Sequence, residues 1–240
     1  YVLVTGDRGF LDEPNPYWPK AGSLQDATRA HLRSQLRHLM DDVGLGEHGL
    51  IRLGTGDWSD GITLEASNKE RAEEHGESIP NTQMAAYLLP RVAAFFDESD
   101  PGFAQEVRDW AAARRTAAEG QWVTSWYRRA WFGDGEPYGE GHLNLEAQIW
   151  ALIADIPQGD RLQTLLDGIY EQLDAPSAVG AQRVPGGDVW HAITGLLTWG
   201  YAHHDPALAW GALRRHTLHA YAEHNPDQWY GIWSGADAMG

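Results

Sequence analysis

Apolar side chains recur every three to four residues along much of the chain, which is the spacing of one face of an α-helix. Residues 23–43 show this period at Leu32, Leu36, Leu39, Met40 and Val43. Ser23 is a suitable N-cap, Asp26 falls in the first turn where the helix dipole favours an acid, and Gly44 follows the last apolar position. These signals predict a helix over 23–43.

Six further segments show the same period. Asp100 and Pro101 form a clear helix start, because aspartate caps well and proline suits the first helical position. A helix over about 80–97 contains Pro90, which we expect to kink it. The remaining helices are predicted to start near Asn144, to cover "GDRLQTLLDGIYEQL", to lie in "VPGGDVWHAITGLLTWGYAHH" and to run from Pro206 to about His224.

The connections between these helices alternate in length. Residues 44–76, residues 174–188 and "YRRAWFGDGEPYGEGHLN" are long, polar and rich in glycine, and the last could hold a short hairpin. Others, such as "DIPQGD" and "HHDPA", are short. This alternation predicts stacked helical hairpins with the long loops gathered at one end, where functional residues usually lie. No linker or repeat divides residues 1–240 into two domains.

Composition narrows the function classes. The net charge of −16 disfavours a nucleic-acid partner, and no apolar run approaches the roughly 20 residues that span a bilayer. The lack of cysteine excludes disulfides and thiolate chemistry and favours a cytoplasmic location. Twelve tryptophans are unusually many, and indole faces serve both helical cores and carbohydrate platforms.

The segment "GTGDWSDGI", residues 54–62, has no helical or strand period. It places Asp57 and Asp60 around Trp58, between glycines. Cleavage of a glycosidic bond needs a protonated carboxyl group, and an adjacent indole favours that form by removing water. A pair of Asx-turns in a surface loop explains the same residues without chemistry. The acids do not have the spacing of an EF-hand loop.

Several segments occur in the order found in one enzyme family. They are "TGDRGFLDEPNPYW", "GLIRLGTGDWSDGI", "WYRRAWFGDGEPYGE", "LNLEAQIWALIADIP" and "GGDVWHAITGLLTWGYA". Together they resemble the catalytic domain of glycoside hydrolase family 94, the cellobiose-phosphorylase family. The resemblance covers nearly the whole chain. Its most specific motif departs slightly at Ser59, where the family usually has asparagine, and a second departure is Trp190, where the family more often has a small polar residue. The resemblance implies an all-α fold, an (α/α)6 barrel with the active site at one end.

A complete barrel of this kind needs about twelve helices, whereas the period predicts about seven. The family's N-terminal β-sandwich and its upstream sugar-binding arginine and aspartate have no counterpart here. We therefore expect residues 1–240 to be the C-terminal portion of the catalytic domain. The remainder of the same protein, or a partner chain, would complete the barrel. Dimers are common in the family, so the resemblance also implies a homodimer.

The resemblance assigns roles to residues of the motif. It makes Asp60 the general acid, while Trp58 lines the sugar subsite and Asp57 holds sugar hydroxyls or orients the loop. Glu77 in "HGESIP" is a candidate sugar ligand, with a charged rim position as the alternative. Gln148 in "LEAQIW" is expected to face the centre of the ring and bind substrate.

The resemblance also implies inorganic phosphate as co-substrate, with no other cofactor. His191 in "GGDVWHA" and Ser234 in "WYGIWSGADAMG" are the matching phosphate ligands. Attack by phosphate on a β-linked glucooligosaccharide would release α-glucose 1-phosphate with inversion. Asp237 leaves a second hypothesis open, an inverting hydrolase or transglycosylase with this carboxylate as base. A third is a helical sugar-binding fragment without catalysis. The histidine pairs lack a third ligand at metal-site spacing, so no metal is expected.

Overall fold

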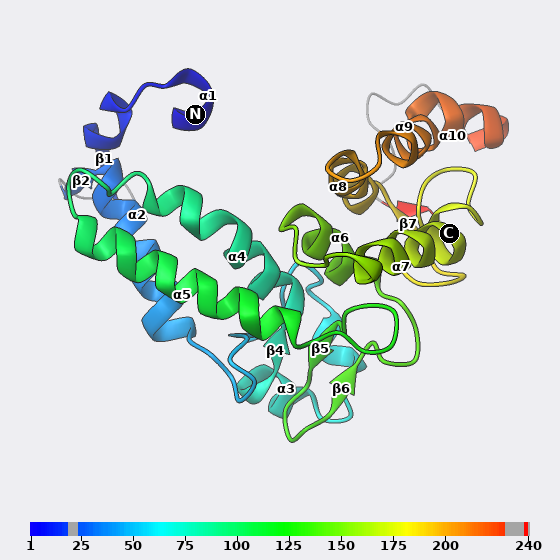
Figure 1. Ribbon diagram of the computed structural model, residues 1–240, viewed down its shortest axis with the longest axis horizontal. Coiled ribbons are helices and arrows are strands. Elements are labelled where there is room, and N and C mark those ends of the chain that lie inside the picture. Colours follow the sequence, from blue (N-terminus) through cyan, green and yellow to red (C-terminus); the bar gives the residue numbers. More distant parts are fainter. Residues whose placement is uncertain (19–23, 229–237, 240) are drawn as a thin grey trace.

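The computed structural model describes residues 1–18, 24–228 and 238–239. Helices dominate it, and together they form an arc with the N-terminus at one tip (Figure 1). The longer helices are α2 (Thr28–Arg37), α4 (Ile79–Ala93), α5 (Pro101–Glu119), α6 (Leu145–Ile153), α7 (Asp160–Ile169), α8 (His191–Ala202) and α9 (Pro206–Arg215). The short ones are α1 (Val2–Thr5), α3 (Lys69–His75) and α10 (Leu218–His224). Helical turns of π type extend α2 over His38–Val43 and α7 over Tyr170–Asp174.

Helical hairpins build the architecture. Helix α4 packs along α5 and α8 along α9, while α6 lies against both α4 and α8. Every residue of α6 except Trp150 is buried, because neighbouring helices cover it on several sides. Paired helices of this kind are the construction of a partial (α/α)6 barrel. The mostly helical fold class predicted from the sequence is confirmed.

Small sheets add to the helices. Four strands, β3 (Ile51–Arg52), β4 (Glu77–Ser78), β5 (Ala130–Trp131) and β6 (Pro137–Tyr138), form one antiparallel sheet in that order. Strands β5 and β6 are the hairpin anticipated between residues 127 and 144. Two further pairs join β1 (Pro14–Pro16) to β2 (Gln25–Ala27) and β7 (Val189–Trp190) to β8 (Ala238–Met239). Strands of two or three residues are too short to show a period of two in the sequence.

Several helix ends agree with the predictions and others differ. The carboxylate of Asp100 accepts a 2.9 Å hydrogen bond from the Phe103 N–H, as expected of the cap of α5. Helix α2 starts later than predicted because residues 25–27 pair with β1, and Ser23 lies outside the described residues. The last predicted helix is divided, since Thr217 caps a new one, α10, after α9 ends. Helix α3 was not predicted because Ala72 is its one buried residue.

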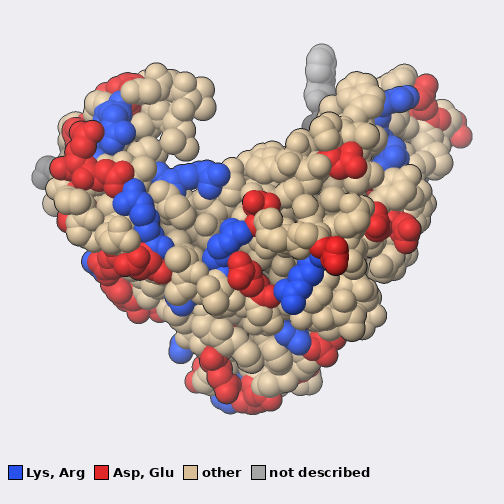
Figure 2. All heavy atoms as spheres, viewed as in Figure 1, with Lys and Arg blue, Asp and Glu red and all other residues tan. Residues whose placement is uncertain are grey.

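Two main groups of buried apolar residues hold the helices together. One surrounds α6 and includes Leu152, Ile169 and Leu197, and the other joins α2, α4 and α5 through Phe96 and Phe103. Acidic and basic side chains are interspersed over the face that Figure 2 shows. In the part of the chain that the structure describes, no helix has the length and apolar character needed to cross a membrane.

Candidate functional site: an anchored acid loop at the start of three helices

Residues 57–60, called the acid loop below, follow strand β3 and precede a 3-10 turn over Ile62–Glu65. The Asp57 side chain is fully buried. Its Oδ1 accepts a 2.9 Å hydrogen bond from the Ser59 N–H, and its Oδ2 accepts a 2.7 Å bond from the Ser78 hydroxyl. The first bond is the Asx-turn considered in the sequence analysis. Asp57 is therefore committed to contacts within its own chain.

Arg129 completes the surroundings of Asp57. Its two terminal nitrogens donate to the two carboxylate oxygens at 2.7 and 2.8 Å, and its side chain is 1% exposed. Burial raises the pKa of Asp57, but the hydrogen bonds and positive charge of Arg129 outweigh burial and hold that pKa below its usual value. Burial likewise lowers the pKa of Arg129, and Asp57 more than restores it. Both groups are thus charged at neutral pH.

The β5–β6 hairpin positions Arg129. This residue directly precedes β5, and its N–H donates a 2.9 Å bond to the carbonyl of Tyr138 on β6. Gly139 follows with a φ of +89°, and a Cβ there would lie 2.8 Å from the backbone N of Arg129. Glycine is needed for both reasons. The hairpin thereby brings a guanidinium to a carboxylate 72 residues earlier in the chain.

The acid loop contacts or neighbours the first residues of three helices. Ser78, which bonds to Asp57, is also the N-cap of α4. Trp58 packs edge-on against Trp190, the N-cap of α8, with ring centroids 5.6 Å apart. Glu146, the second residue of α6, lies 3.9 Å from Nε of Arg129. The N-terminal ends of α4, α6 and α8 therefore meet around one loop.

Asp60 differs sharply from Asp57. It is exposed, and no other described residue bonds to its carboxylate. The sequence predicts that the indole of Trp58, two residues away, removes water from this acid. In the structure Trp58 instead packs on Trp190 and the core around α6, so it does not bury Asp60.

Glu77 is buried rather than at a rim. Its Oε1 accepts bonds from the N–H groups of His48 and Leu50 at 3.0 and 3.1 Å, and its Oε2 contacts Nδ1 of His48 at 2.5 Å. The His48 ring stacks on Trp131 at 4.0 Å. A Cβ at Gly46 would overlap the Glu77 carboxyl group, so only glycine fits this approach. These contacts show Glu77 ordering residues 46–50, and its sugar contact remains a prediction.

Gln148 is also fully buried and fully bonded. Its Oε1 accepts a 2.8 Å bond from the Tyr127 N–H, and its Nε2 donates to the carbonyls of Tyr127 and Asn144 at 2.8 and 2.9 Å. The amide thus joins α6 to the segment that leads into Arg129. Substrate binding by Gln148 remains a prediction.

His191 is the first residue of α8, and its ring lies 5.7 Å from that of His216. Burial, with a smaller contribution from His216, lowers the pKa of His191, and burial lowers that of His216. Both rings are therefore neutral at pH 7. Ser234 and Asp237, the other residues predicted for the attacking side, lie outside the described residues.

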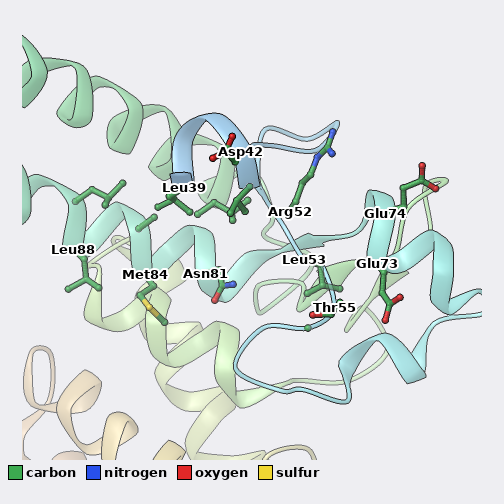
Figure 3. Close-up of a pocket in the computed structure, with 16 residues that line it drawn as sticks. Leu39, Asp42, Arg52, Leu53, Thr55, Glu73, Glu74, Asn81, Met84 and Leu88 are labelled. Atoms are coloured by element: carbon green, nitrogen blue, oxygen red, sulfur yellow. The ribbon is translucent and has the colours of Figure 1, made fainter. Parts of the chain in front are cut away.

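One cavity borders the acid loop, and a larger one borders the residues that precede the loop. The first, of about 260 Å³, is lined by Ser59, Gly61, Ile62, Leu64, Glu65, Arg129, Tyr138, Glu146 and Arg183. The larger one, of about 640 Å³, is lined by Gly54, Thr55 and Gly56 and lies between the end of the α2 segment, α3 and α4 (Figure 3). Leu39, Leu53, Met84 and Leu88 give the larger cavity an apolar wall, and its other side chains include Asp42, Arg52, Thr55, Glu73, Glu74 and Asn81.

Four residues that shape this site were not predicted from the sequence. They are Ser78, Arg129, Glu146 and Arg183. Glu146 alone had a usable signal, because an acid within the otherwise apolar "LNLEAQIWALI" implies a buried charge. Arg129 has no local signal, since its partner is distant in sequence.

Comparison with known proteins identifies the family. Residues 1–185 match the model of the "Glycosyl hydrolase 94 superfamily, catalytic domain". The chain belongs to this family. The glycosyl hydrolase 94 resemblance drawn from the sequence is thus confirmed, and it assigns the chain to a family of enzymes.

Two relatives of this glycosyl hydrolase 94 chain come from Paenibacillus borealis. A solabiose phosphorylase is 30% identical over 185 residues, which are 73% of this chain and 23% of the relative. A 3-O-beta-D-glucopyranosyl-beta-D-glucuronide phosphorylase is 33% identical over 163 residues, 65% of this chain and 20% of the relative. The chain thus spans less than a quarter of the length of these curated relatives.

A solved structure shows the same fold. It is an uncharacterized conserved protein from Thermus thermophilus, with a TM-score of 0.50 and 16% sequence identity. The match covers 65% of this chain and 43% of that protein. At this identity the likeness concerns the fold alone.

Proposed function

We propose that the chain supplies the proton donor and the phosphate-binding side of an inverting glycoside phosphorylase. Its substrate would be a β-glucosidic bond in a glucodisaccharide or oligosaccharide. The observation that carries the proposal is the contrast between the two acids of the loop. Asp57 is held by Arg129, whereas the carboxylate of Asp60 is exposed and bonds to no described residue. Membership of glycosyl hydrolase 94 and the phosphorylase relatives support it.

In this reaction Asp60 donates its proton to the glycosidic oxygen as the bond from that oxygen to the anomeric carbon breaks. A phosphate oxygen forms the new bond to that carbon from the opposite face. The products are α-glucose 1-phosphate and a sugar shortened by one unit. Asp57 is unsuited to the acid role because Arg129 keeps it ionised. Asp57 instead orients the loop, and Trp58 is our proposed wall of the sugar subsite.

His191 is our proposed phosphate ligand in the described part of the chain. It opens a helix of 12 residues, where free N–H groups and the helix dipole favour an anion. Its lowered pKa leaves a neutral imidazole that can donate one hydrogen bond without adding a charge. Ser234, which comes from the sequence alone, is the proposed second ligand.

We further propose that residues 1–240 are one portion of a longer catalytic domain. The support is the short span relative to the relatives and the partial ring of helices. Other sugar ligands would then come from the remainder of the protein.

Product analysis of the intact protein tests this function. β-Linked glucooligosaccharides are incubated with and without phosphate, and NMR then distinguishes glucose from glucose 1-phosphate among the products. We expect cleavage to require phosphate and to yield the α-anomer. Asp60→Asn should lower the rate by about 10²–10⁴-fold, the usual contribution of a general acid. Asp109→Asn, at an exposed position on α5, is the matched control.

Equal cleavage without phosphate would contradict the phosphorylase. It would favour the hydrolase hypothesis, under which Asp237→Asn abolishes activity. Full activity of Asp60→Asn would contradict both enzymatic assignments, and absence of any cleavage by the intact protein would leave the sugar-binding hypothesis.

A further inference from the structure

Glu146 is a buried carboxylate whose hydrogen-bonding capacity is unused. The residue is 4% exposed, and among the described residues neither Oε1 nor Oε2 has a hydrogen-bond partner. A buried charge without such bonds is costly, so proteins rarely keep one without a reason. Its position at the start of α6 places it beside the acid loop.

Two guanidinium groups flank Glu146 at distances too long for hydrogen bonds. Nε of Arg129 is 3.9 Å from Oε2, and Nη1 of Arg183 is 3.8 Å from Oε1. The terminal nitrogens of Arg129 are occupied by Asp57, which leaves its Nε side toward Glu146. The backbone of Arg183 is fixed, since its carbonyl accepts a 2.9 Å bond from the Leu145 N–H. The charges are thus balanced, while the hydrogen bonds are missing.

Glu146, Arg129 and Arg183 are all among the residues that line the cavity of about 260 Å³. This volume is on the order of a single sugar ring, below the range for drug-sized ligands. Tyr138 contributes an aromatic side chain, and Ser59 and Gly61, the two neighbours of Asp60, form part of the wall. A ring bound here would therefore lie next to the proposed proton donor.

We propose that this cavity binds one neutral hexose unit, with two adjacent hydroxyls donating hydrogen bonds to the two oxygens of Glu146. Arg183 donates to a hydroxyl oxygen of the same ring. A cationic ligand is disfavoured by the two guanidiniums, and an anionic one by Glu146 and by Glu65 at the cavity wall. Hydroxyl groups can both donate and accept, so they satisfy both kinds of partner. The proposal deepens the proposed function and rests on it for the class of ligand.

Binding without turnover tests the proposal. D-Glucose and its 2-, 3-, 4- and 6-deoxy analogues are titrated into the intact protein without phosphate, and affinities are measured by NMR. We expect Glu146→Gln to weaken glucose binding by roughly 10-fold or more, as for loss of hydrogen bonds to a charged group. One deoxy analogue, or two that lack adjacent hydroxyls, should bind the wild type as weakly as glucose binds Glu146→Gln. The Glu146→Gln variant should bind these analogues and glucose with equal affinity.

Two further variants separate binding from folding. Arg183→Gln, whose side chain is 31% exposed, should weaken glucose binding with little loss of stability. Glu140→Gln, an exposed acid paired with Arg128, is the matched control and should bind like the wild type. The proposal is overturned if Glu146→Gln, shown to be folded by circular dichroism, binds glucose normally, or if it keeps the wild-type discrimination among the deoxy sugars. Because no reaction is followed, this result is independent of whether phosphate or water attacks.

Discussion

The hydroxyl of Ser78 serves two elements at once, because it caps helix α4 and binds Asp57. It accepts a 3.2 Å hydrogen bond from the Asn81 N–H and donates a 2.7 Å bond to Oδ2 of Asp57. The position of the acid loop is thereby tied directly to the start of α4. A change at Ser78 should affect both.

Ser78→Ala should lower both stability and activity. Loss of an N-cap costs about 0.5–2 kcal/mol, and loss of a bond to the buried Asp57 adds to it. Thr217→Ala is the matched control, because Thr217 caps α10 through the Ala220 N–H without contacting the site. Urea unfolding and the cleavage rate provide the two measurements. If both variants lose the same amount of stability and neither loses activity, the bond from Ser78 to Asp57 does not contribute to activity, and the prediction is wrong.

Arg129→Leu should destabilise the protein strongly. Removal of one partner from a buried pair leaves the other charge uncompensated, at a cost of about 3–5 kcal/mol. Asp57→Asn in the same protein should recover part of that loss, because the uncompensated charge is then gone. The double-mutant cycle is measured by urea unfolding.

Arg71→Leu is the contrasting variant. Arg71 also forms a two-bond pair, with Asp134, but on the surface, where water and salt screen it. We expect little change in its unfolding midpoint. If Arg71→Leu loses as much free energy of unfolding as Arg129→Leu, burial does not determine how strongly these ion pairs stabilise the protein.

The half-buried histidines His191 and His216 should make stability depend on pH. Burial holds the pKa values of His191 and His216 below 6.5, so the unfolded chain binds more protons as the pH falls below that value. Their contribution to stability is therefore complete above pH 6.5 and declines as the pH falls toward the folded pKa. The slope is at most about 1.4 kcal/mol per pH unit for each ring, and less here because both keep some solvent contact.

His216→Asn should flatten this dependence, whereas His219→Asn should preserve it because His219 is 80% exposed. Unfolding midpoints between pH 7.5 and 5 compare the two variants with the wild type. Identical pH profiles for His216→Asn and the wild type would contradict the assignment.

Local signals accounted for most of the fold. Asp100 and Pro101 predicted the start of α5 because capping and proline geometry involve residues three apart. The alternation of long and short loops predicted the hairpins. Helix α3 was not predicted because Ala72 is its one buried residue, and polar contacts such as the Asn68 cap stabilise it. The four-stranded sheet was not predicted because it joins segments that are distant in sequence.

The sequence predicted less of the candidate site than of the fold. The motif identified Asp57 and Asp60 but could not distinguish an anchored acid from a free one, since the distinction depends on Arg129, 72 residues away. Trp58, two residues before Asp60, suggested a desolvated acid. Its side chain instead points to Trp190, and the sequence does not show this direction. Glu77 and Gln148 have the polar atoms of sugar ligands, and only the fold shows those atoms bonded to backbone groups.

Under the proposed function, with Asp60 as the proton donor, the anchoring of Asp57 also bears on the entropy of catalysis. Three hydrogen-bond donors, the Ser59 N–H, the Ser78 hydroxyl and the Arg129 guanidinium, already hold the loop three residues before Asp60. A bound sugar then needs to immobilise the Asp60 side chain rather than the whole loop, at about 0.5–1.5 kcal/mol instead of the larger cost of ordering several backbone residues. More of the binding energy of the sugar therefore remains for stabilising the transition state.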